Sequence, residues 1–173
     1  MKKTFLMTLL LAAAICTSAA EKIQLPVIWQ SKSAKDQVKE FAMLETKDRV
    51  YFAFRIPALQ KYDGKTTLTV SVYFDTDKNI ATGREKLGCD FQVNVHLHRN
   101  NLVAMTWAGK KNTTLRFGKG DYTIERKGDV LAVSFNRAKL PGVEFKKLFA
   151  VRMMPYQFNY SIDSSKNFGK ISL

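Results

Sequence analysis

Two short stretches decide the fold: residues 68–75 read LTVSVYFD, and residues 90–98 read DFQVNVHLH. In each, apolar side chains occupy every second position, from Leu68 to Phe74 and from Phe91 to Leu97, and mostly polar side chains stand between them. A period of two is typical of a β-strand that buries one face and leaves the other in water. The sequence therefore predicts two half-buried strands joined by the loop between them.

The same alternation recurs along most of the chain after its first twenty residues. VYFAFRI at 50–56 repeats it, and further strands are expected at 23–29, 39–46, 102–107, 113–117, 122–126, 130–135, 148–155 and around 171. Turns rich in Gly, Asn, Asp and Lys separate these segments. About nine or ten short strands at this spacing predict an all-β fold, an antiparallel β-sandwich of jelly-roll-like form.

The first twenty residues read MKKTFLMTLLLAAAICTSAA and differ from the rest. Two lysines precede an apolar run over 5–15, and small residues follow at 18–20, which is the order of a secretory signal peptide. Because Ile15 precedes Cys16, where a lipoprotein needs a small residue, we favour cleavage after Ala20 and export to the periplasm or beyond. Residues 1–20 are thus a predicted signal peptide, and residues 21–173 a predicted single β-sandwich domain without a transmembrane segment.

The charge of the chain is uneven. The formal net charge is +13, and two of these charges lie in the signal. Residues 21–98 carry 12 basic and 10 acidic side chains, whereas residues 99–173 carry 14 and 5. A basic surface favours anionic partners such as acidic glycans or lipopolysaccharide, and export argues against nucleic acid. A solvated basic face without a partner is the alternative.

A polar face is expected where three strands meet. If strands 50–56, 68–75 and 90–98 share one sheet, aromatic, amide and guanidinium groups gather on its outer side. Aromatic rings stack on the apolar faces of sugars, and amides and guanidinium groups bond to hydroxyls. The alternative is the ordinary wet face of an antiparallel sheet. The candidate ligand-binding residues are Tyr51, Arg55, Tyr73, Gln92, Asn94 and His96, with Trp107 as a possible stacking platform.

The loop YFDTDKNIATGREKLGCDF, residues 73–91, carries a candidate metal site. Asp75, Asp77 and Asn79 stand at alternate positions, and Asp90 returns at the far end. Four oxygen-bearing side chains suit a hard cation such as calcium. The loop is not an EF-hand, since Lys86 holds the twelfth place, where that motif has Glu. Side chains that cap backbone N–H groups in a long turn are the alternative.

The other chemistry-bearing residues predict less. His96 and His98 are two apart and would face the same way on a strand, but two imidazoles without a third ligand make a weak metal site. After signal cleavage Cys89 is the only cysteine, which excludes an internal disulfide and favours a buried small apolar residue. No phosphate loop, GxSxG or HExxH is present, and no second cysteine remains after signal cleavage, so an enzyme is not expected.

The central loop and its flanks resemble the DOMON-like sandwiches, and especially the family 9 carbohydrate-binding modules. The matching places are an Asp-x-Asp turn, a Thr-Gly and a Gly-x-Asp-Phe at Asp75, Asp77, Asn79, Thr82, Gly83, Gly88, Asp90 and Phe91. RVYFAFRIP at 49–57 and NFGKISL at 167–173 are similar to that group's early strand and its ending. The resemblance implies a β-sandwich, glycan binding and often a structural calcium.

Three functions follow for the exported chain. The first is a non-catalytic carbohydrate-binding β-sandwich, with acidic glycans as a weaker addition. The second is a haem-binding or electron-transfer module, because some DOMON relatives bind haem through a His and a Met; His96 or His98 with Met105, Met153 or Met154 would imitate this. The third is an envelope-associated structural protein without a small ligand. The sequence does not indicate the sugar or the oligomeric state.

Overall fold

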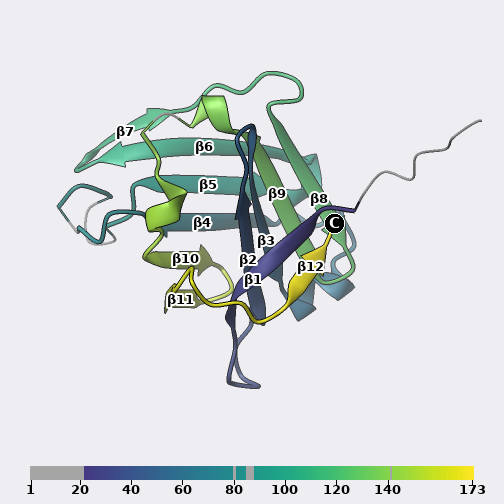
Figure 1. Cartoon of the computed structure of the whole chain (residues 1–173). Coiled ribbons are helices and arrows are strands. Elements are labelled where there is room, and N and C mark those ends of the chain that lie inside the picture. Colours follow the sequence, from purple (N-terminus) through teal and green to yellow (C-terminus); the bar gives the residue numbers. More distant parts are fainter. Residues whose placement is uncertain (1–21, 80, 85–87, 141) are drawn as a thin grey trace, which may run out of the picture.

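The chain folds as an antiparallel β-sandwich (Figure 1). The computed structural model describes residues 22–79, 81–84, 88–140 and 142–173. These residues form twelve strands in two sheets of six, which confirms the expected fold class with slightly more strands. The predicted signal peptide lies outside the described residues. No helix in the described ranges is long and apolar enough to cross a membrane.

The first sheet has the strand order β12-β1-β2-β3-β9-β8. Its strands are β1 (Gln24–Gln30), β2 (Glu40–Glu45), β3 (Arg49–Arg55), β8 (Tyr122–Lys127), β9 (Val130–Asn136) and β12 (Lys170–Ser172). The second sheet has the order β11-β10-β4-β5-β6-β7. Its strands are β4 (Thr69–Asp75), β5 (Phe91–His96), β6 (Asn101–Ala108), β7 (Lys111–Thr114), β10 (Ala150–Met154) and β11 (Phe158–Ser161). Short 3-10 turns lie at Pro57–Lys61, Leu97–Arg99, Arg137–Lys139 and Phe145–Lys147.

The core between the sheets follows from the alternation in the sequence. In β4, Val70, Val72 and Phe74 are buried, and the residues between them are half-buried on the outer side. Five phenylalanine rings fill the centre with edge and tilted contacts, and the Phe52 and Phe74 centroids are 4.6 Å apart. The five are Phe52, Phe74, Phe91, Phe135 and Phe145. Such ring contacts add to the burial of apolar area, which is the main stabilising term in a fold of this size.

The expectation that strands 50–56, 68–75 and 90–98 share one sheet is wrong. β3 pairs with β2 and β9 in the first sheet, whereas β4 pairs with β5 and β10 in the second. The chain crosses between sheets at the 3-10 turn Pro57–Lys61, where buried Leu59 packs into the core. Strands β3 and β4, although consecutive in the chain, therefore lie in different sheets, and the outer side of β3 faces away from that of β4.

Candidate functional site

The outer face of the second sheet gathers most of the predicted ligand-binding residues. Tyr73 of β4 lies opposite Gln92 of β5, and the next rows pair Ser71 with Asn94 and Thr69 with His96. Trp107 follows on the same side of β6, past the Gln92 and Met105 pair. Tyr73, Gln92, Asn94, His96 and Trp107 thus share one face, as the alternation predicts.

Arg84 completes this face, although sequence reasoning did not select it. Its guanidinium carbon lies 5.2 Å from the ring centroid of Tyr73 and 5.3 Å from that of Trp107. The Arg84 Nη1 donates to the amide oxygen of Gln92 at 3.5 Å. Cation–π contacts with aromatic rings orient an arginine and reduce the rotamer freedom it must lose on binding. The two aromatic rings thus flank a guanidinium group of the chain itself.

The backbone around Arg84 holds it in place. The Arg84 N–H donates to the Cys89 carbonyl at 2.8 Å, and the Gly88 N–H donates to the Arg84 carbonyl at 2.9 Å. A Cβ on Gly83 would lie 2.4 Å from the Cys89 carbonyl oxygen, so only glycine allows this close approach. Cys89 itself is buried, as expected, and burial raises the pKa of its thiol to about 11.

An amide chain runs under Arg84. The indole N–H of Trp107 donates to the Gln92 amide oxygen at 3.2 Å, and the Gln92 amide nitrogen donates to the Asn94 oxygen at 3.0 Å. Gln92 is only 6% exposed, so its polar atoms depend on these partners. The chain fixes Trp107 and Asn94 relative to one another.

A depression of about 220 Å³ lies on the other side of Tyr73. Arg152 of β10 is the cross-strand neighbour of Tyr73, and Asn159 of β11 is the cross-strand neighbour of Arg152. Both line the depression together with Met154 and Gln157. Tyr73 therefore stands between this depression and Arg84.

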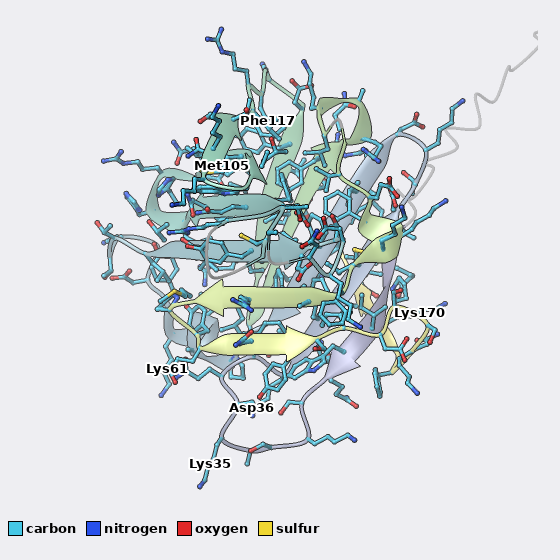
Figure 2. The ribbon with its side chains drawn as sticks, turned by 90° about the vertical axis from the view of Figure 1, so that its left-hand side faces the viewer. Lys35, Asp36, Lys61, Met105, Phe117 and Lys170 are labelled. Carbon is cyan, nitrogen blue, oxygen red and sulfur yellow. The ribbon has the colours of Figure 1, made fainter. Side chains whose placement is uncertain are left out.

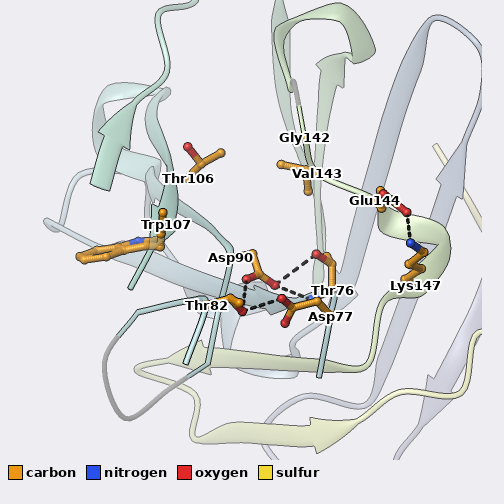
Figure 3. A pocket seen from close by; sticks show the side chains of 11 residues that line it. Thr76, Asp77, Thr82, Asp90, Thr106, Trp107, Gly142, Val143, Glu144 and Lys147 are labelled. Carbon is orange, nitrogen blue, oxygen red and sulfur yellow. Dashed lines mark hydrogen bonds and ion pairs between the residues drawn. The ribbon is translucent and has the colours of Figure 1, made fainter. Parts of the chain in front are cut away.

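A larger groove of about 440 Å³ opens at the end of the sheet (Figure 3). Trp107 forms one wall, and the segment 142–147 forms the opposite one, where Glu144 and Lys147 are ion-paired at 2.5 Å. Hydroxyls of Thr76, Thr82 and Thr106 and carboxylates of Asp77 and Asp90 line the rest. The groove and the outer face meet at Trp107.

The predicted metal ligands of the acidic loop accept hydrogen bonds from its own backbone, as the capped-turn interpretation expects. Asp75 Oδ1 accepts from the Lys78 N–H at 2.8 Å, Asp77 Oδ1 from the Asn79 N–H at 2.9 Å, and Asn79 Oδ1 from the Ala81 N–H at 3.0 Å. Asp90 Oδ2 accepts from the Thr76 N–H at 2.8 Å. Each predicted metal ligand therefore caps the backbone of the turn.

Three of the same carboxylates also converge. One oxygen each from Asp75, Asp77 and Asp90 lies within 4.8 Å of the others. Burial, and then the nearby carboxylates of Asp77 and Asp75, raises the pKa of Asp90. Oxygens bound to one calcium at about 2.3–2.6 Å are at most about 5 Å apart, so the trio fits such a cation. Asn79 uses its oxygen within the turn.

The two histidines have different surroundings in the structure. His96 Nδ1 lies 2.9 Å from the Thr69 hydroxyl on the outer face, and the His96 and His98 rings are 6.4 Å apart. The Nδ1 of His98 is buried without a hydrogen-bond partner among the described residues.

The acidic trio is the one cluster of three metal-ligating side chains among the described residues. Of the three candidate methionines, Met105 lies on the outer face, Met153 in the core and Met154 in solvent.

Tyr51 and Arg55 do not belong to the outer face of the second sheet. Both project from the outer side of β3 in the first sheet, where Arg55 forms ion pairs with Glu40 at 2.8 Å and Asp129 at 2.9 Å. Tyr51 lies opposite Leu44 and Ser134. The predicted ligand surface therefore loses these two members and gains Arg84 and Arg152.

Trp29 is the other tryptophan of the chain, and its half-buried ring packs against the core. Its ring lies 4.7 Å from that of Phe158 and 4.6 Å from that of Tyr160, near Asp36, which accepts from the Tyr160 hydroxyl at 3.0 Å. Figure 2 shows Asp36 next to the tip of the loop between β1 and β2, on the opposite side of the molecule from Met105. Of the two tryptophans, Trp107 is thus the one that lies on the outer face of the second sheet beside Tyr73 and Arg84.

Comparison of the chain with protein-family models, curated proteins and solved structures gives no match. The class that the fold defines is an antiparallel β-sandwich. The resemblance of the central loop to DOMON-like sandwiches and family 9 carbohydrate-binding modules stays a prediction.

Proposed function

We propose that this protein is an exported, non-catalytic β-sandwich that binds carbohydrate on the outer face of its second sheet. The observation that carries the proposal is the set of groups around Tyr73: two aromatic rings, an amide chain and two arginines on one face. Sugars present flat C–H faces and many hydroxyls, and they are bound by aromatic rings with amide and guanidinium groups beside them.

The exposed polar groups of this face suit saccharide hydroxyls. Neutral polar side chains lie near Tyr73 on this face: Ser71 and Asn94 pair in the next row, and Asn159 follows Arg152 on the edge strand β11. Amides and hydroxyls both donate and accept, which matches the dual character of a sugar hydroxyl. The depression beside Tyr73 and the groove beyond Trp107 give a saccharide two recesses along one surface.

The acidic loop is proposed to hold a structural calcium. Asp75, Asp77 and Asp90 would supply its carboxylate oxygens. The charge of the cation would relieve the repulsion among these carboxylates and tie the start of the loop, at the end of β4, to the start of β5. The loop also carries Arg84, so its rigidity supports the ligand surface.

A saccharide array at low ionic strength tests the proposed function. The proposal expects binding to at least one glycan class, and loss of that binding in the Tyr73→Ala and Asn94→Ala variants. If the protein binds no glycan on the array, the alternative of a structural protein without a small ligand is favoured. A Soret band in the visible spectrum of the purified protein would favour the haem-binding alternative, because only a bound porphyrin gives that absorption.

A further inference from the structure

We propose that Arg84 and Arg152 form an anion subsite on the two sides of Tyr73, and that the saccharides bound there are acidic. This inference rests on the proposed function and names its ligand class. The group recognised is a carboxylate, sulfate or phosphate carried by a sugar.

The first observation is that neither guanidinium group is ion-paired with a carboxylate of the described residues. Within the described ranges, no carboxylate lies at ion-pair distance from Arg84 or Arg152, whereas Arg55 and Arg137 each form such pairs. Among the described residues, the guanidinium group of Arg84 contacts an amide oxygen and two aromatic rings. An arginine held in this way keeps N–H donors for a ligand.

The second observation is that the two arginines share one ring as their neighbour. Arg84 lies over the Tyr73 ring, and Arg152 is the cross-strand partner of Tyr73 at the depression of about 220 Å³. Since Arg84 covers one face of the ring, a saccharide would stack on the other face, at the depression, with its substituents beside Arg152 and with Arg84 on the far side of the ring. Arginine forms paired hydrogen bonds to planar carboxylates and to phosphate or sulfate oxygens, and charge makes those bonds about twice as strong as neutral ones.

The third observation concerns the other charged groups of this face. Asp75 lies two residues along β4 from Tyr73, but its carboxylate turns into the acidic loop, where it accepts from the Asp77 and Lys78 N–H groups. His96 lies two rows away and contacts Thr69. Among the described residues, the charged groups next to Tyr73 are therefore the two guanidinium groups of Arg84 and Arg152.

The test is an array of matched saccharides. Carboxylated, sulfated and phosphorylated members, including a lipopolysaccharide core, stand beside carboxyl-reduced, desulfated or dephosphorylated counterparts, so the array identifies the anionic group and its source. We expect the acidic member of a pair to bind at least about tenfold more tightly, since charge-assisted bonds to arginine are lost in the neutral one.

The variants Arg84→Gln and Arg152→Gln should each lower acidic binding by about tenfold and leave neutral binding unchanged. The Arg152 side chain forms no ion pair or hydrogen bond with the part of the chain that the structure describes, so Arg152→Gln keeps the test valid if Arg84→Gln disturbs its loop. Arg84→Lys keeps the charge but not the planar fork and should recover only part of the affinity. Lys170→Gln removes one charge on β12 of the first sheet (Figure 2) and should change nothing.

A titration with inorganic sulfate distinguishes the anion subsite from carbohydrate binding. Sulfate binding is monitored by the fluorescence of Trp107 in a Trp29→Phe background at constant ionic strength. If matched saccharides bind equally and both arginine variants behave as wild type, the inference is overturned and carbohydrate binding stands. If no saccharide binds but sulfate shifts the emission in an Arg84-dependent way, the anion subsite stands and carbohydrate binding falls. If neither ligand acts, both are overturned.

Discussion

The indole N–H of Trp107 donates to the amide oxygen of Gln92, 3.2 Å away across the outer face of the second sheet. The same oxygen accepts from Arg84. One buried amide therefore sets the position of an aromatic wall and of a cation. The fixed positions of Trp107 and Arg84 therefore depend on a hydrogen-bond acceptor at residue 92.

Replacement of that acceptor should loosen the site without unfolding the protein. Gln92→Leu leaves the Trp107 and Arg84 donors without their partner, and each lost hydrogen bond costs about 1 kcal/mol. We expect a red shift of Trp107 emission with a small fall in thermal stability. Gln92→Glu retains an acceptor and should keep the wild-type emission. Identical spectra for wild type and Gln92→Leu would show that the amide does not position the ring.

Gly83 should tolerate no side chain. A Cβ there would lie 2.4–2.5 Å from backbone atoms of Cys89, which no rotamer change can relieve. Gly83→Ala should therefore destabilise the fold by about 1–3 kcal/mol, as overpacking does, in chemical denaturation. Gly118→Ala is the control, because its Cβ would meet only the Asp121 side chain at 3.4 Å. Equal midpoints for the two variants would contradict the close approach.

The acidic loop should make stability depend on pH and on calcium. Burial and neighbouring carboxylates raise the pKa of Asp90 in the folded state. Its contribution to stability is therefore present below the unfolded pKa and is lost as pH rises through the folded pKa. When a chelator removes calcium, Asp90→Asn should have a higher melting temperature than wild type at neutral pH. This difference should disappear at acidic pH.

Added calcium should reverse this order. A ligand that binds only the folded state stabilises it by about 2.7 kcal/mol at one hundred times its dissociation constant. We expect calcium to raise the melting temperature of wild type and to act far less on Asp90→Asn, with magnesium as the control cation. A melting temperature that is the same in calcium and in chelator would remove the proposed metal site.

The phenylalanine core should dominate the stability of the sandwich. Phe74 is 1% exposed and contacts Phe52, Phe91 and Phe145. Phe74→Ala should cost about 3–5 kcal/mol in the free energy of unfolding, because the cavity removes both burial and ring contacts. Phe168→Ala, at a ring that is 45% exposed, should cost less than about 0.5 kcal/mol. Similar losses for both would place the core elsewhere.

The sequence predicts the strands well because side-chain alternation is local. The period of two in β4 and β5 identifies which residues are buried and which share the outer face, from Tyr73 to Asn94. It carries no information about which strands pair, since pairing depends on the path of the connections. The 3-10 turn after β3 therefore places Tyr51 and Arg55 on the other sheet, against the prediction.

The rest of the candidate site depends on contacts between residues distant in the chain. Arg84 follows a Gly in a polar loop, and nothing in its neighbours indicates that the loop folds back between two aromatic rings. Arg152 lies in a segment predicted as a strand, but only the pairing of β10 with β4 places it beside Tyr73. Asp75 and Asp90 were predicted to converge because they begin and end one loop, and they do.

The two tyrosines Tyr73 and Tyr51 give the most direct test of carbohydrate binding on the second sheet. Both stand on the outer side of a central strand and are partly buried, but on opposite sheets. The measurement is isothermal titration of wild type, Tyr73→Ala and Tyr51→Ala with the tightest saccharide from the array. We predict at least about a fivefold loss of affinity for Tyr73→Ala, since a stacked ring contributes about 1 kcal/mol or more, and wild-type affinity for Tyr51→Ala. Unchanged affinity in Tyr73→Ala, or a loss confined to Tyr51→Ala, would contradict this prediction.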